Sequence, residues 1–236
     1  MQGLLPPAPA SRRRRTTATA AALPRRRMPC FLLLLVVVLA AALPPAHAQP
    51  PPTVIQIGDS WTELSAQSLA TFCSGATVVN RGVSSSTALE WASGSSCPAG
   101  GGSTCSMADA FSSAHGSGYT HAIVSIGGND FLDTQGCGMS AAELASRVTS
   151  VVNALRAAAP AGIQIILVGY CTPTGPYADC ATPALVANLN SGIAAAAAAA
   201  ADVTYIDGTA ACGGSTSAFS PGTYHIDPIH LNSKGY

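Results

Sequence analysis

Charged side chains are scarce in this chain of 236 residues, of which Asp, Glu, Lys and Arg together form only 9%. Basic side chains are scarcest after residue 48, because seven of the eleven Lys and Arg residues lie in Arg12–Arg15 and Arg25–Arg27. The remainder, Gln49–Tyr236, carries four basic against eleven acidic residues and thus a net charge of −7. Neither a phosphate backbone nor acidic lipid headgroups are attracted to such a surface. We therefore expect no nucleic acid and no anionic membrane among its partners.

A hydrophobic run long enough to cross a bilayer is also lacking. The longest run, Phe31–Leu43, has 13 residues, whereas a transmembrane helix needs about 20. Arg25–Arg27 precede this run and Ala46-His47-Ala48 follow it, which is the pattern of a secretory signal with a small-residue cleavage site. The sequence therefore predicts a signal or targeting segment at residues 1–48 and a secreted domain without a stable membrane anchor at residues 49–236.

The basic segment Ser11–Thr17 leaves two other interpretations of the leader open. It contains no acidic residue, so it also fits an organelle transit peptide placed ahead of a second signal, which would deliver the protein to an organelle lumen. Alternatively, it is a long basic region of one signal, or Met28 is the true first residue.

Short runs rich in Val and Ile recur after residue 49 and are followed by Gly, Asp or Asn, which is typical of buried parallel strands. Five such strands are predicted, at Thr53–Ile57, Thr77–Asn80, His121–Ile126, Ile163–Val168 and Val203–Ile206. Helices are predicted between them, at Ser60–Phe72, Ala141–Ala158 and Pro183–Ala201. The alternation indicates a three-layer α/β/α fold with a parallel sheet covered on both faces. No repeat or linker divides this segment, so we expect one domain.

Seven cysteines follow residue 48, a density that favours disulfides in an exported chain. We expect the local pairs Cys97–Cys105 and Cys171–Cys180, each closing a loop rich in Gly, Ser or Pro. Three cysteines then remain: Cys73, Cys137 and Cys212. The sequence also stops at Asn232–Tyr236, which resembles the start of a helix, so we expect a C-terminal helix and a partner cysteine beyond residue 236.

Four polar segments stand where predicted strands give way to loops, which is where an open α/β sheet collects its functional groups. They are Gly58-Asp59-Ser60, Asn80-Arg81-Gly82, Gly127-Gly128-Asn129-Asp130 and Asp227-Pro228-Ile229-His230. Ser60 opens a predicted helix, whose N-terminal N–H groups stabilise an anion. However, Ser60-Trp61-Thr62-Glu63 also fits a capping box, with Ser60 as N-cap and Glu63 at N3. A purely structural role for Ser60 therefore stays open.

The segment Asp227-Pro228-Ile229-His230 supplies the residue types that activate a serine. A serine hydroxyl needs a neighbouring base, and the base needs a partner that holds its tautomer. Spaced three residues apart, Asp227 and His230 can lie on one side of a tight loop, whereas His225 is the second candidate for the base. Gly82 and Asn129 can donate hydrogen bonds to an oxyanion, although both also fit plain turns.

Two other kinds of site use residues of the same segments. His225, Asp227 and His230 could hold a metal ion by residue type alone. A flavodoxin-like nucleotide binder is disfavoured because Gly58-Asp59-Ser60 lacks a glycine-rich phosphate loop. We expect neither a metal nor a cofactor.

In this order, the four segments resemble the conserved blocks of the SGNH hydrolases, also called GDSL-type esterases and lipases, over essentially all of residues 49–236. The resemblance implies a flavodoxin-like five-stranded parallel sheet and a metal-independent serine esterase. It implies Ser60 as nucleophile, His230 as base and Asp227 as its orienting acid. The implied oxyanion hole consists of the N–H groups of Ser60 and Gly82 and the amide of Asn129. Trp61 departs from the leucine of the family name, and the family's usual helix after the histidine is missing.

The function implied by this resemblance is ester hydrolysis through an acyl-enzyme by a secreted monomer. The expected substrates are small-molecule or polysaccharide esters, with short acyl groups or O-acetyl groups on cell-wall carbohydrate. Two alternatives remain: a lipase or lysophospholipase, and a catalytically silent relative that binds carbohydrate.

Overall fold

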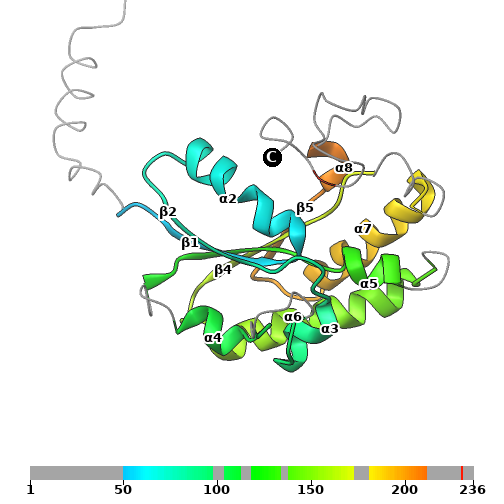
Figure 1. The fold of residues 1–236 in the computed structure, drawn as a ribbon, viewed down its shortest axis with the longest axis horizontal. Helices are drawn as coiled ribbons and strands as arrows, with labels where there is room; N and C mark the ends of the chain where they lie inside the picture. The colour runs from blue at the N-terminus through cyan, green and yellow to red at the C-terminus, as the bar shows by residue number, and fades with distance from the viewer. Residues whose placement is uncertain are drawn as a thin grey trace, which may run out of the picture. The chain divides into compact units, whose positions relative to one another are not determined.

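The computed structural model describes residues 50–97, 104–112, 118–133, 138–172 and 181–211 together with His230. Within these ranges, five parallel strands form one sheet in the order β2-β1-β3-β4-β5 (Figure 1). The strands are β1 (Thr53–Gly58), β2 (Thr77–Gly82), β3 (His121–Ser125), β4 (Gln164–Val168) and β5 (Val203–Ile206). The predicted parallel sheet is confirmed, and its strand order is that of a flavodoxin-like doubly wound fold.

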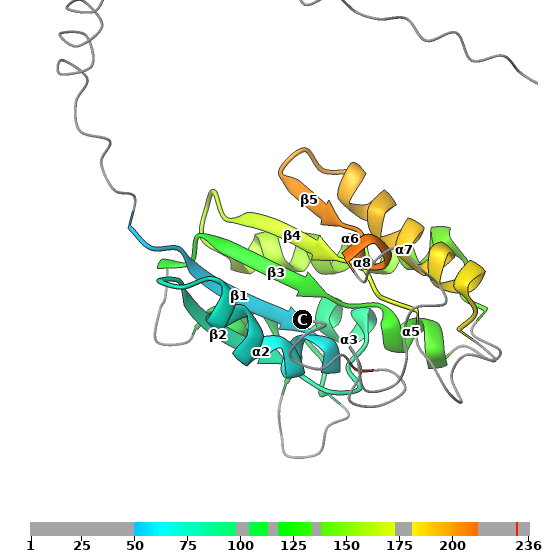
Figure 2. The same ribbon diagram turned by 90° about the horizontal axis from the view of Figure 1, so that it is seen from above.

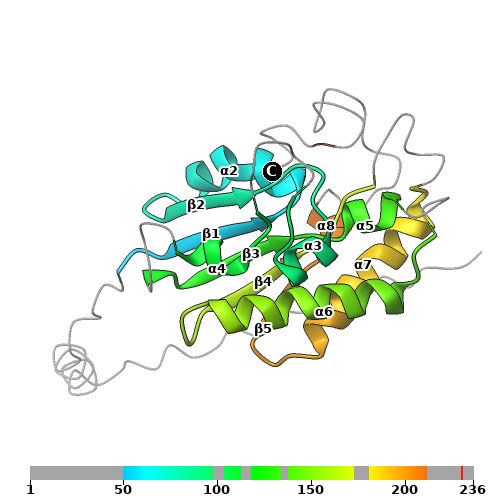
Figure 3. The same ribbon diagram turned by 60° about the horizontal axis from the view of Figure 1, so that its bottom comes forward.

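Helices cover both faces of this sheet, as the alternating pattern predicted (Figures 1 and 3). Helix α2 (Ser60–Phe72) lies on one face, and α6 (Ala141–Ala158) lies on the other, beside α3 (Ala88–Ser93) and α4 (Met107–Phe111). Helix α7 (Pro183–Ala198) packs along α6. Two short helices, α5 (Gly128–Asp133) and α8 (Gly208–Ala211), follow strands β3 and β5. No helix among the described residues has the length and apolar character needed to span a membrane.

The core lies between the sheet and α6. The inward side chains of the central strands are almost completely buried, and so is one face of α6: Ile55, Ile57, Val124, Ile165, Leu167, Leu144, Val148, Val151, Val152 and Leu155. The helix predicted at Ala141–Ala158 is thereby confirmed, with one apolar face against the sheet. Burying each such side chain contributes roughly 1.5–3 kcal/mol to folding. This packing gives the strand ends a rigid base.

The carboxyl ends of all five strands lie at one edge of the sheet, toward the side of α5 in Figure 2. The turn after β1 requires a glycine, because Gly58 has a φ of 147° and a Cβ there would lie 1.9 Å from the carbonyl oxygen of Ser125. The next N–H, that of Asp59, donates a hydrogen bond of 3.1 Å to the same oxygen. The start of α2 is therefore fixed directly against the end of β3.

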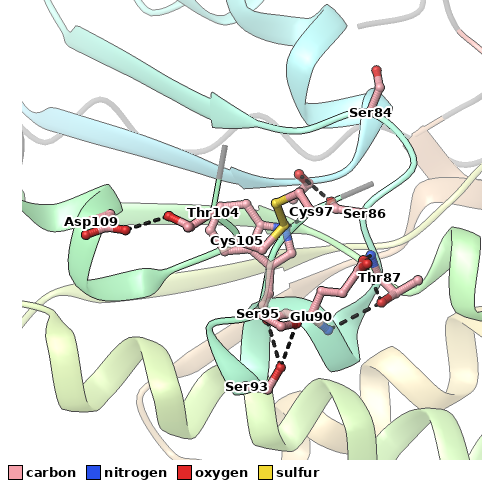
Figure 4. The surroundings of a disulfide bond; sticks show 12 residues. Ser84, Ser86, Thr87, Glu90, Ser93, Ser95, Cys97, Thr104, Cys105 and Asp109 are labelled. Carbon is pink, nitrogen blue, oxygen red and sulfur yellow. Dashed lines mark hydrogen bonds between the residues drawn. A yellow bond between two sulfur atoms is a disulfide. The ribbon is translucent and has the colours of Figure 1, made fainter. Parts of the chain in front are cut away.

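The disulfide Cys97–Cys105 is confirmed, with a Cα–Cα distance of 5.4 Å (Figure 4). It joins the segment after α3 to the residue before the N-cap of α4, next to an isolated antiparallel bridge between Ser96 and Thr104. Cys171 is disulfide-bonded as well, but its expected partner Cys180 lies outside the described residues, as do Cys137 and Cys212. Cys73 is exposed and free.

The longer predicted helices agree with the structure, whereas the short ones were missed. Helices α3, α4, α5 and α8 have at most six residues, which is too few for a 3.6-residue periodicity to be recognised. Helix α7 ends at Ala198 rather than Ala201, and its alanine tract has one buried and one exposed side, as expected.

Candidate active site

Ser60 is the first residue of α2 and follows strand β1 by two positions. Its Oγ lies 2.8 Å from Nε2 of His230, although the two residues are 170 positions apart in the chain. At this distance a neutral imidazole can accept the hydroxyl proton. The N–H of Ser60, at the first helical position, has no carbonyl partner within the helix. The structure thus brings the expected nucleophile and base together.

The capping box that Ser60-Trp61-Thr62-Glu63 also fits is not formed, because α2 is capped one residue earlier. Asp59 is the N-cap, and its Oδ1 accepts a hydrogen bond of 3.0 Å from the N–H of Trp61. Glu63 does not fold back onto the helix end, since its Oε2 accepts hydrogen bonds from the N–H of Ser84 (3.0 Å) and from the Ser84 hydroxyl. A carboxylate caps a helix as well as a hydroxyl does. The hydroxyl of Ser60 is therefore left for His230.

The structure places Gly82 away from the cavity that contains Ser60. Its N–H donates a hydrogen bond of 2.7 Å to Oδ1 of Asn80, and it lines a different cavity together with Arg81. A Cβ at position 82 would lie 2.2 Å from the backbone nitrogen of Glu63. The glycine therefore permits close packing of β2 against α2, and its N–H is not brought to Ser60.

The loop after β2 instead brings Ser84 and Ser85 to the cavity of Ser60 and His230. Ser85 has a φ of 63° and is the only non-glycine residue with a positive φ in the described ranges. Its backbone N–H takes part in no hydrogen bond found among the described residues. An exposed serine held in this conformation carries backbone strain of roughly 1–2 kcal/mol. Its sequence neighbourhood, Ser84-Ser85-Ser86, gave no signal of this conformation.

The same loop is anchored from several sides. The N–H of Val83 and the hydroxyl of Ser86 both donate to the carbonyl oxygen of Gly58, at 2.8 Å and 3.2 Å. The indole N–H of Trp91 donates to Oγ of Ser86 at 3.0 Å, and Nδ2 of Asn129 donates to its carbonyl oxygen at 2.9 Å. A carboxamide has two N–H donors, so Asn129 keeps one for a bound group.

Asp59 and Tyr170 form a buried pair next to Ser60. The Tyr170 hydroxyl donates a hydrogen bond of 2.5 Å to Oδ2 of Asp59, and the two side chains are 4% and 2% exposed. Burial raises the pKa of Asp59 from 3.8 to about 7, while the hydrogen bonds from Tyr170 and Trp61 and the charge of His230 act in the opposite direction. Burial and the adjacent carboxylate raise the pKa of Tyr170 well above 10. Asp59 therefore titrates near neutral pH.

A second buried carboxylate, that of Asp130, joins the neighbouring helices. Its Oδ2 accepts a hydrogen bond of 2.6 Å from the N–H of Ala88, at the start of α3. Its Oδ1 accepts one of 3.1 Å from Arg147 of α6, which also pairs with Glu143 at 2.8 Å. Since Asp130 follows Asn129 directly, this network fixes α5 and the carboxamide of Asn129.

A cavity of about 400 Å³ contains both Ser60 and His230. Its polar lining residues include the loop serines Ser84 and Ser85 and Asn129. Its apolar lining residues come from α2, α5, α7 and the segment before α7: Trp61, Phe131, Leu132, Ala181, Val186 and Leu189. The arrangement suits a molecule with a polar reacting group and an apolar part.

Part of the expected site lies outside the described residues. Asp227, the expected partner of His230, lies outside the described residues, and so does His225, the second candidate for the base. In the ranges that the structure describes, no three His, Cys, Asp or Glu side chains are grouped as metal ligands, but the proposed ligands His225 and Asp227 fall outside them. Sequence reasoning missed Ser85 and Tyr170. Tyr170 follows β4 by two residues, so its position at a strand end was the available signal.

Comparisons with known proteins agree with this geometry. Residues 48–236 match the model of the GDSL-like Lipase/Acylhydrolase family. A comparison with curated proteins gave no significant match. Among solved structures, an acetylxylan esterase from Geobacillus stearothermophilus is similar with a TM-score of 0.54 and 14% identity, over 78% of this chain and 88% of that one.

A GDSL-family lipolytic protein from Veillonella parvula is similar to the same degree, with a TM-score of 0.54 and 14% identity over 78% of this chain and 91% of that one. At such identity the structural likeness establishes the fold alone, whereas the family match spans most of the sequence. The chain therefore belongs to the GDSL-like lipase and acylhydrolase family, and its broad activity class is that of an ester hydrolase.

Proposed function

We propose that this protein is a serine esterase that works through an acyl-enzyme, with Ser60 as nucleophile and His230 as general base. The observation that carries the proposal is the distance of 2.8 Å between Ser60 Oγ and His230 Nε2 at the mouth of one cavity. Asp227 is proposed to hold the tautomer of His230, as the family resemblance implies.

The proposed reaction has two halves. Ser60 Oγ attacks the ester carbonyl carbon while His230 Nε2 takes its proton, and the collapse of the tetrahedral intermediate releases the alcohol, which receives that proton. Water, deprotonated by His230, then attacks the acyl-serine; as the tetrahedral intermediate collapses, His230 returns this proton to Ser60 Oγ and the acid is released. Neutral His230 is needed at the start of each half.

The oxyanion of these intermediates needs preorganised donors. We propose the N–H of Ser60, the second N–H of the Asn129 carboxamide and the N–H of Ser85. The Gly82 N–H is replaced in this set because it already donates to Asn80. In support of Ser85, the residue lines the cavity, and its N–H has no hydrogen bond among the described residues.

We propose short-chain acyl esters as substrates, including O-acetyl esters of carbohydrate. The polar lining residues Ser84, Ser85 and Asn129 suit a hydroxylated alcohol part, and a structural neighbour is an acetylxylan esterase. The alternative is a lipid ester, which the apolar lining residues favour. Acetyl, butyryl, octanoyl and palmitoyl p-nitrophenyl esters separate the two: kcat/KM should fall beyond butyryl for the first and rise toward the long chains for the second.

The decisive test of the chemistry is Ser60→Ala. We expect it to abolish hydrolysis of p-nitrophenyl acetate and labelling by a fluorophosphonate, with the unfolding temperature kept within a few degrees. The control is Ser150→Ala, which removes an exposed hydroxyl whose bond is to Ser146 of the same helix. Undiminished activity in Ser60→Ala would refute the assignment. An unlabelled wild-type protein that binds acetylated xylooligosaccharides would favour the silent relative.

We also propose that the protein is secreted after removal of residues 1–48. The support is the apolar run Phe31–Leu43 between basic residues and Ala46-His47-Ala48. N-terminal sequencing of the exported protein should begin at Gln49. A mature protein inside an organelle would instead support the bipartite leader.

A further inference from the structure

The carboxylate of Asp59 receives two hydrogen bonds from groups on different parts of the fold. Its Oδ1 accepts from the N–H of Trp61 at 3.0 Å, within the first turn of α2. Its Oδ2 accepts from the hydroxyl of Tyr170 at 2.5 Å, 111 positions further along the chain. Ser60 lies between Asp59 and Trp61 in sequence. The turn that contains Ser60 is therefore connected, through the hydrogen bond between Asp59 and Tyr170, to the segment that follows β4.

Tyr170 is itself held rigidly. Its backbone N–H and carbonyl are both bound by the carboxamide of Asn190, each at 2.8 Å. Its ring meets the ring of Trp61 edge to face, with centroids 5.1 Å apart. On another side, a Cβ at Gly128 would lie 2.9 Å from the same ring. With backbone and ring both fixed, the hydroxyl oxygen is held beside Oδ2 of Asp59, to which it donates; the side chain of Ser125 and the backbone of Gly128 face the same hydroxyl.

We propose that Tyr170 is a positioning residue of the reaction: through its hydrogen bond to Asp59, it fixes the β1–α2 turn so that Ser60 Oγ stays within reach of His230. The inference rests on the proposed serine esterase activity. Tyr170 does not exchange a proton in this scheme. Its effect on the nucleophile is exerted through Asp59.

The charge state of Asp59 gives the positioning a pH dependence. Both donors match the two oxygens of an ionised carboxylate, whereas a protonated carboxyl group presents one oxygen with its own proton. The Tyr170 hydrogen bond and the charge of His230 lower the pKa of Asp59, and the nearby Asp130 raises it. Removal of the Tyr170 hydroxyl must therefore raise this pKa. Loosening of the turn then begins at a higher pH.

The test is Tyr170→Phe in the full chain, with p-nitrophenyl acetate as substrate. A small displacement of a reacting group lowers rates by one to two orders of magnitude. We expect kcat to fall about 10- to 100-fold with KM within about twofold, and the acid limb of the kcat profile to move to higher pH. The control Tyr205→Phe removes a half-buried hydroxyl without a hydrogen-bond partner in the described ranges, and should change neither.

A double-variant cycle separates positioning from general stability. If Tyr170 acts through Asp59, adding Tyr170→Phe to Asp59→Asn should lower kcat by less than threefold and should not move the acid limb. Equal losses of kcat in both backgrounds, or a Tyr170→Phe variant with wild-type kcat and pH profile, would overturn the inference. Failure of the proposed function is distinguishable, because the wild-type protein itself would then resist the fluorophosphonate and show no esterase activity.

Discussion

The two buried carboxylates beside the cavity, Asp59 and Asp130, are each 2% exposed, yet their surroundings differ. Asp130 accepts a hydrogen bond from the guanidinium group of Arg147, a permanent positive charge. Asp59 accepts from a tyrosine hydroxyl and a backbone N–H, both of them neutral donors. A buried charge with a fixed counter-charge holds neighbouring elements together, whereas burial without a fixed counter-charge raises the pKa of a carboxyl group. The pKa of Asp59, next to the nucleophile, is raised to about 7.

The largest effect is expected from Asp130→Ala. Loss of this carboxylate leaves the N–H of Ala88 without its acceptor and the half-buried Arg147 with only its exposed partner Glu143. Because two hydrogen bonds to a charged group are lost, the free energy of unfolding should fall by about 3–5 kcal/mol. Urea denaturation at pH 7 measures it. The matched control is Glu143→Gln, which removes the exposed partner of the same Arg147 and should cost less than about 0.5 kcal/mol. Similar losses of unfolding free energy in both variants would contradict the expected difference between the buried Asp130–Arg147 contact and the exposed Glu143–Arg147 pair.

A smaller effect of opposite sign is expected from Asp59→Asn. The pKa of Asp59 is raised in the folded protein from 3.8 to about 7, so the folded state binds more protons than the unfolded state between these values. This carboxyl group therefore lowers stability progressively as pH rises from about 4 to 7, and the loss is complete above pH 7. Asparagine keeps the capping oxygen and removes the charge. The variant should be more stable than wild type by up to about 4 kcal/mol at pH 8 and nearly equal to it at pH 4.

Urea unfolding of the wild type and of Asp59→Asn at pH 4, 6 and 8 measures the difference in their free energies of unfolding. The pH effects of all other groups cancel in this difference. Asp109→Asn, at an exposed site on α4, makes the same change of charge and serves as the control. A constant difference across the three pH values would mean that Asp59 does not titrate in this range. If Asp59→Asn is more stable than wild type at pH 8 and also has a lower kcat, the ionised Asp59 lowers the stability of the protein while supporting its activity.

The smallest effect is expected from Ser85→Gly. Glycine adopts the positive φ of this position without strain, but it also gains freedom in the unfolded chain. We expect a net gain of up to about 1 kcal/mol in the free energy of unfolding, with kcat within about threefold because the backbone N–H is kept. Ser84→Gly, at the neighbouring position, should destabilise through loss of the hydroxyl bond to Glu63. A tenfold loss of kcat in Ser85→Gly would point to the hydroxyl rather than the N–H.

The sequence predicted the sheet, the longer helices and the meeting of Ser60 with His230, because these depend on residue order and on strand ends lying at one edge. It did not predict the partners of Asp59, since Tyr170 reaches it only through the side-by-side placement of β1, β3 and β4. Gly82 is instructive: its N–H was expected to donate to an oxyanion, whereas the group packed against this glycine is the backbone of α2. Local pattern identifies the need for space, and only the tertiary structure identifies what fills it.

The separation of 170 positions between Ser60 and His230 also has a consequence for synthesis. A chain emerges from the ribosome with its N-terminus first. The segment that contains Ser60 can therefore begin to fold while His230 is still inside the ribosome. Contacts between such distant residues form late, because closing a long loop is entropically costly. The serine therefore remains unactivated on the nascent chain. Labelling by a fluorophosphonate therefore reports completed folding, and its time course can be used to follow folding.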